Sequence, residues 1–90
     1  MTTESDFQTM RQRLCDSGVM TRWHDFDADT MRLELTATVG GVRLRTEALI
    51  CYRGLSDAVY GCRKMHALQR LAVTMRRLSE AVVARECEGK

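Results

Sequence analysis

The chain lacks any apolar run approaching the length of a transmembrane helix, and its first residues lack the basic and apolar regions of a secretory signal peptide. It has no glycine-rich loop that would offer an oxyanion hole, and no local motif ties either histidine to a cysteine. We therefore predict a cytoplasmic, non-enzymatic binding protein with reduced thiols, which needs no cofactor. Its 90 residues allow one domain, 1–90, with a core too small to surround a large catalytic cleft.

Acidic residues and proline are both absent from residues 58–79, which nevertheless carry Arg63, Lys64, Arg70, Arg76 and Arg77. A helix that collects only positive charge is a candidate binding surface, because its field is not neutralised locally. The imbalance extends along the chain. Six acids against three arginines give the first thirty residues a net charge of −3, so residues 31–90 carry +5. Arginine supplies twelve of the fourteen basic residues, and its planar guanidinium suits carboxylate, phosphate and aromatic partners.

The N-terminal segment has the pattern of a helix over about residues 6–17. Ser5 and Gln8 have the spacing of a capping box, in which the serine oxygen and the glutamine side chain satisfy free amides. Gly18 is the residue type that ends a helix in a left-handed conformation. The apolar residues that share one face are Phe7, Met10 and Leu14.

Residues 31–39 alternate between apolar and polar side chains, and this alternation resumes over 42–52, so both are predicted to be half-buried strands. Gly40-Gly41 between them predicts a two-residue hairpin turn, because both glycines can take a positive φ. Residues 19–26 alternate less cleanly, but the turn-like sequence that follows indicates a third antiparallel strand ahead of the hairpin.

The hairpin also predicts a register. With Val39 opposite Val42, Glu34 lies opposite Glu47 on the open side of the sheet. Arg32 and Arg45 are then diagonal neighbours of the two glutamates, which favours a charge lattice over a catalytic acid pair. The residues expected in the core are Leu33, Leu35, Leu44 and Ile50.

A long helical pattern runs from Leu55 to Glu86, with Ser56 as its cap. A straight helix of this length measures about 48 Å, whereas a compact domain of this size is only about 30 Å across. Either the helix breaks or it overhangs its domain. Its apolar residues form two groups about 120° apart on a helical wheel, so the two halves bury different surfaces, and Gly61 is the natural place for a bend. The first group is Leu55, Ala58, Val59, Cys62 and Met65, and the second is Leu68, Leu71, Met75, Leu78 and Val82. The whole pattern predicts an α+β fold of helix, three-stranded antiparallel sheet and long C-terminal helix (αβββα), with both helices on one sheet face.

We name the second group the apolar stripe. Its spacing of three and four resembles the contact line of a short coiled coil. If the helix overhangs its domain, the exposed part of the stripe must be covered, which predicts a homodimer. The interface residues would be Leu71, Met75, Leu78 and Val82.

Opposite the apolar stripe, the same helix carries a basic stripe of Arg63, His66, Arg70 and Arg77. A solvated helix face is one interpretation, since most charge runs serve solubility. The other is a binding face, because no acid four residues away compensates the arginines until Glu80 follows Arg76. The predicted partner-binding residues are Arg63, His66, Arg70, Arg76 and Arg77, with Trp23 as a possible interface anchor.

Two candidate metal sites are weak. The acidic segment 25–29 resembles the opening of a calcium loop, but Thr30 and Thr36 replace the glycine and glutamate that such a loop needs. Cys62 and His66 have the spacing of two zinc ligands on one helix, and Cys51 and His24 would have to supply the others. We expect a polar turn, a buried cysteine and a surface histidine instead, with no metal.

The order of elements resembles the double-stranded-RNA-binding domain in topology only. Where that family opens its second helix with phosphate-gripping lysines, this chain has Gly54-Leu55-Ser56-Asp57-Ala58-Val59, so the RNA-contacting residues do not carry over. In size, mixed charge and absence of catalytic motifs, the chain is also similar to small phage-encoded inhibitors such as anti-CRISPR proteins. That resemblance implies a phage or mobile-element inhibitor of a host protein or nucleoprotein complex. The alternative is a direct nucleic-acid-binding or regulatory protein that uses the basic stripe.

Overall fold

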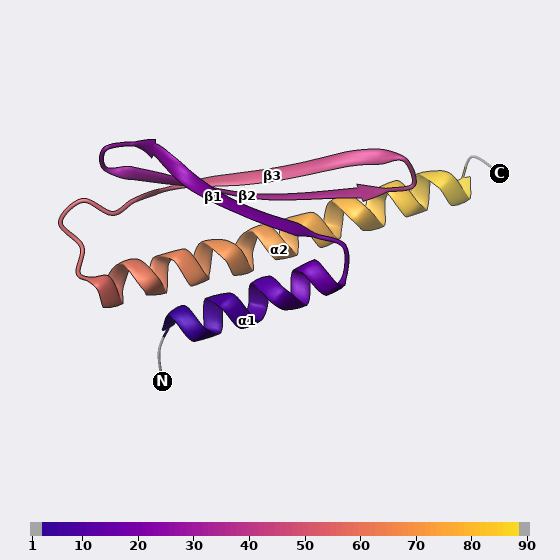
Figure 1. The fold of residues 1–90 in the computed structure, drawn as a ribbon. Helices are drawn as coiled ribbons and strands as arrows, with labels where there is room; N and C mark the ends of the chain where they lie inside the picture. Colours follow the sequence, from indigo (N-terminus) through magenta and orange to yellow (C-terminus); the bar gives the residue numbers. More distant parts are fainter. Residues whose placement is uncertain (1–2, 89–90) are drawn as a thin grey trace.

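In this computed structural model, which describes residues 3–88, two helices cover one face of an antiparallel sheet. The elements in chain order are α1 (Thr3–Asp16), β1 (Met20–Asp27), β2 (Thr30–Val39), β3 (Val42–Cys51) and α2 (Asp57–Glu88). The strand order is β1-β2-β3, so β2 is central and the other two are edge strands (Figure 1). The predicted αβββα arrangement is confirmed. Within the described residues, no helix combines the length and the apolar character that crossing a membrane requires.

The end of α1 is as expected, but its beginning is not. Gly18 has φ +90°, and Val19 N–H donates to the Leu14 carbonyl at 2.8 Å, which closes a Schellman-type cap. The helix begins at Thr3, so Ser5 lies inside the first turns, where its carbonyl accepts from Thr9 Oγ1. The predicted capping box is therefore wrong, because α1 already begins two residues before the serine that was expected to precede its first turn.

The hairpin and its register are confirmed. Gly40 and Gly41 both have positive φ, +55° and +80°, as a type I′ turn requires. Val39 pairs with Val42, and Glu34 with Glu47. A side chain at Gly40 would also collide with the carboxylate of Glu86, so the last turns of α2 reach the tip of the hairpin. Figure 1 shows this end of α2 beside the turn.

The core lies between the sheet and the helices. Leu33 and Leu35 of β2 are fully buried, Ile50 of β3 is nearly so, and Leu44 packs partly buried at the margin. The complete buried cluster is Phe7, Met31, Leu33, Leu35, Ile50, Leu68, Leu71 and Met75. The predicted sheet face thus forms the core, and the apolar stripe of α2 packs against it.

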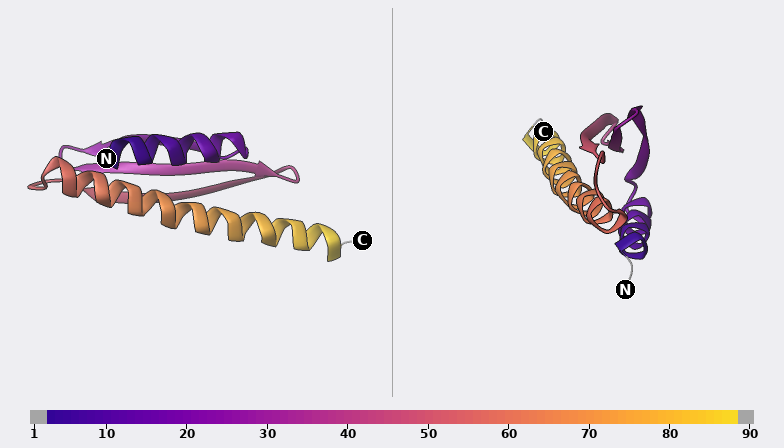
Figure 2. Two further views of the ribbon diagram at one scale, coloured as in Figure 1. Left: turned by 90° about the horizontal axis from the view of Figure 1, so that it is seen from below. Right: turned by 90° about the vertical axis from the view of Figure 1, so that its left-hand side faces the viewer.

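The predicted bend at Gly61 is wrong: α2 is one unbroken helix (Figure 2). Ser56 caps it as expected, accepting from Val59 N–H at 3.3 Å. The expectation of a bend assumed a near-spherical domain. Ten-residue strands are about 33 Å long, however, and the molecule measures 52 × 28 × 15 Å, so the sheet is itself a platform for a long straight helix.

The apolar stripe continues toward the start of α2 through a lysine. Lys64, one helical turn before Leu68, is only 9% exposed, and its Nζ lies 4.5 Å from the Phe7 ring centroid and 5.6 Å from that of Tyr60. A cation held over aromatic faces can occupy such a site. In the first half of α2, the side chains that face the core are therefore those of Tyr60 and Lys64. The first apolar group does not form the second buried surface that its pattern predicted. Ala58, Val59 and Cys62 are exposed.

Leu35→Ala is expected to lower the free energy of unfolding by about 2–5 kcal/mol, because it leaves a cavity between the central strand and the helices. Leu49→Ala is the matched control, since Leu49 lies on the same sheet but is 55% exposed, and it should change stability by no more than about 0.5 kcal/mol. Urea denaturation measures both. Equal losses in the two variants would contradict the packing described.

Lys64→Met should keep the free energy of unfolding within about 1.5 kcal/mol of the original, because an unbranched apolar side chain fits the same aromatic surroundings. Lys64→Glu should cost about 3 kcal/mol or more, because it places a carboxylate against the negative ring faces. Urea denaturation of both variants tests this difference, and similar stabilities would show that Lys64 is not held by the rings.

Candidate binding groove between β3 and α2

The outer edge of β3 faces a groove of about 490 Å³ whose other wall is α2. Within residues 3–88, β3 pairs with β2 along one edge and with no strand along the other. The groove is lined by consecutive residues 47–51 of β3 and by Arg63, His66, Ala67, Arg70, Leu71 and Thr74 of α2. An unpaired strand edge and a basic helix face therefore border the same depression.

The α2 wall carries positive charge without a local counter-ion. Arg63, His66 and Arg70 are exposed, and in the part of the chain that the structure describes no carboxylate pairs with their side chains. Arg63 and Arg70 are two helical turns apart, about 10.5 Å along the axis. The wall therefore presents two spaced guanidinium groups to the groove.

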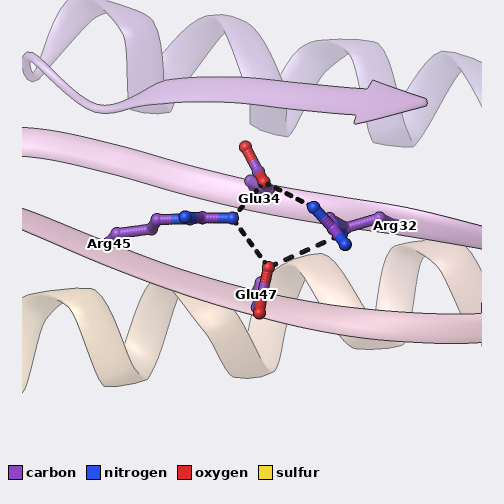
Figure 3. A network of polar contacts seen from close by, with 4 residues as sticks. All are labelled: Arg32, Glu34, Arg45 and Glu47. Atoms are coloured by element: carbon purple, nitrogen blue, oxygen red, sulfur yellow. Dashed lines mark hydrogen bonds and ion pairs between the residues drawn. The ribbon is translucent and has the colours of Figure 1, made fainter. Parts of the chain in front are cut away.

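The one acid in the groove, Glu47, is already engaged. Its Oε2 lies 3.0 Å from Arg45 Nη2 and 3.6 Å from Arg32 Nε, and Arg45 also donates to Glu34 Oε1 at 2.6 Å (Figure 3). The hydrogen bond and the charge of Glu34, then the charge of Glu47, raise the pKa of Arg45 above its ordinary value. The predicted charge lattice is confirmed, and it holds the Glu47 carboxylate on the open sheet face.

The structure brings together three of the six predicted partner-binding residues. Arg63, His66 and Arg70 line the groove, and Arg77 continues the stripe but is not among the lining residues. Arg76 lines a different depression, between α2 and α1. Trp23 lines neither depression and lies on β1, the other edge strand of the sheet. Its ring meets that of Phe7 edge-on at 5.5 Å and lies under Arg11, so the tryptophan covers the core from β1.

The apolar stripe does not provide the dimer surface expected of it. Leu71 and Met75 are 7% and 2% exposed in the single chain, because the sheet covers them. Those two interface assignments are wrong. Leu78, at 37% exposure, and the half-buried Val82 remain accessible near the end of α2. Dimerisation itself stays a prediction.

The cysteines and histidines are distributed in a way that spacing alone did not reveal. Cys51 and His66 line the same groove, whereas His24 lies on β1, opposite Arg32. Cys62, expected to be buried, is exposed and borders a shallow depression with Val59. Among the described residues, no three or more histidine, cysteine or acidic side chains converge as metal ligands would.

The residues of β3 that line the groove were not identified from the sequence. No local signal marks Leu49 or Cys51 as a binding position, because the groove depends on which edge of the sheet α2 packs beneath. Comparison with known proteins adds no identification: the chain matches no known family, no curated protein and no solved structure.

Glu34→Ala should cost about 1–3 kcal/mol, because Glu34 is only 7% exposed and its loss leaves two arginines without their most buried partner. Glu47→Ala is the matched control on the paired position of β3. Its side chain is half exposed, so the expected loss is only about 0.2–1 kcal/mol. Urea denaturation at low and high salt compares the two, and a larger loss for Glu47→Ala would contradict the role given to Glu34.

Proposed function

We propose that this chain is a non-enzymatic binding protein whose β3–α2 groove takes an acidic surface of a host protein or nucleoprotein complex. One observation carries the proposal: Arg63 and Arg70 stand on the groove wall with no counter-ion among the described residues. Arginine forms strong, paired hydrogen bonds to carboxylates, and a partner that supplies them would neutralise the wall.

A protein partner suits the groove better than nucleic acid. The basic residues stand on the α2 wall only, and the β3 wall presents Glu47 and the apolar Leu49. Nucleic-acid binding draws most of its affinity from many phosphate contacts, whereas the groove offers two arginines, Arg63 and Arg70, on a single wall. A mixed wall of this kind accommodates a peptide chain with both acidic and apolar side chains.

An inhibitor is the activity we assign to such binding. A chain of this size would act by occupying a partner's surface, as the small phage-encoded inhibitors it resembles do. The support for that class is analogy of size and charge alone. An adaptor that holds the same partner without blocking it would use the same contacts.

The test is capture from a host lysate by the immobilised protein, with partners identified by mass spectrometry. Arg63→Glu/Arg70→Glu should remove the specific partner, because both guanidinium contacts become repulsive. Arg13→Glu/Arg85→Glu is the matched control: it makes the same change of net charge at two exposed positions outside the groove. The control should retain the partner.

Nuclease treatment and salt then separate the two candidate functions. A protein partner should survive nuclease, whereas direct nucleic-acid binding should disappear and should weaken steeply with rising salt whatever the sequence. Retention of the partner by Arg63→Glu/Arg70→Glu would contradict the proposal and leave the basic stripe as a solvated face. In that case the open sheet face is the next surface to test.

A further inference from the structure

The groove combines two features that point to one kind of occupant. Residues 47–51 of β3, whose outer edge is unpaired in the described part of the chain, line one wall, and Arg63 and Arg70 line the opposite wall. An edge strand presents a row of free amide and carbonyl groups, which another extended segment can pair with. The same segment would then lie beside both arginines.

We propose that the occupant of the groove is an extended acidic segment of the partner, added to β3 as a fourth strand. This inference rests on the proposed function and specifies how the acidic partner is held. Main-chain hydrogen bonds to β3 would supply affinity, and alternate side chains would supply specificity. The segment's side chains would point alternately toward α2 and toward the open sheet face.

The two walls define the pattern of this segment. Alternate residues on the helix side would be acidic, to meet Arg63 and Arg70, which are spaced about 10.5 Å apart along α2. Residues two and four apart on a strand are spaced by about 7 and 13 Å, a range that long arginine side chains can span. The intervening residues would lie beside the exposed Leu49 on the open face, which favours apolar or β-branched side chains.

A second copy of this chain is the less suitable occupant. Pairing two β3 edges in one continuous sheet would place the two α2 helices on the same face, across the junction from each other. The Arg63 and Arg70 side chains of both copies would then meet, and like charges in close contact are unfavourable. An acidic strand neutralises the same wall.

The probe is a synthetic peptide of about ten residues in which glutamate alternates with valine or threonine, long enough to span the 47–51 edge. Its binding is followed by NMR of the isotope-labelled full chain. We expect amide shifts and slowed hydrogen exchange at residues 47–51, with smaller changes on β1. The same peptide with lysine in place of glutamate should bind at least about tenfold more weakly, because its charge is repelled by the arginines.

Two N-methylated isomers separate strand addition from simple charge attraction. One carries N-methyl groups on the glutamates and the other on the valine and threonine residues. Because alternate amides of a strand point to opposite edges, one isomer blocks pairing with β3 and the other leaves it intact. We expect one isomer to lose at least about tenfold in affinity and the other to bind as the parent does.

Failure of this inference is distinguishable from failure of the proposed function. If both isomers bind like the parent, the peptide is held by side chains alone: strand addition is wrong, and acidic binding in the groove stands. If Arg63→Glu/Arg70→Glu leaves the parent peptide's affinity unchanged, acidic recognition by this groove is wrong. Absence of peptide binding at millimolar concentration, or self-association of the chain through β3, also overturns the inference.

Discussion

The packing of the apolar stripe of α2 against the central strand determines most of this structure. Leu68, Leu71 and Met75 are buried with Leu33 and Leu35, and this contact sets the rotation of α2 about its own axis. Arg70 precedes Leu71 by one position, about 100° around the helix, so burial of Leu71 directs the arginine toward the margin of the sheet. The groove follows from this rotation and from the placement of α2 beside β3.

Features with a local cause could be predicted from the sequence. Two adjacent glycines at positive φ determined the hairpin, and one strand pair then fixed the whole register, including the opposition of Glu34 and Glu47. Apart from the capping box at Ser5, the errors arose where the cause was not local. The expected bend at Gly61 assumed a rounder domain, and Lys64 concealed the continuation of the apolar stripe because lysine is rarely a core residue. The groove could not be predicted, because it depends on where α2 lies relative to β3, and the periodicity of the sequence does not determine that placement.

The charges of the molecule are divided between two environments. On the open sheet face, Arg32 and Arg45 form ion pairs with Glu34 and Glu47, so these four charges largely neutralise one another. On α2, the arginines that line the groove have no such partners among the described residues. A formal charge of +2 therefore understates the local field at the groove. An unpaired positive charge that is confined to one surface attracts an acidic partner to that surface. It therefore orients the encounter as well as adding to affinity.

The aromatic surroundings of Lys64 have a consequence for how uniquely the chain folds. An aliphatic contact between two helices tolerates a shift of one turn, because leucine packs against leucine in either position. The contact between Lys64 and Phe7 is less tolerant, because a shift of α1 along α2 would take the Phe7 ring away from the ammonium group and remove that cation–π contact. Alternative alignments of α1 would therefore lose a contact that the native alignment makes. Lys64 thus favours the native docking position of the first helix and, through the short connection from α1 to β1, the native placement of the far edge of the sheet.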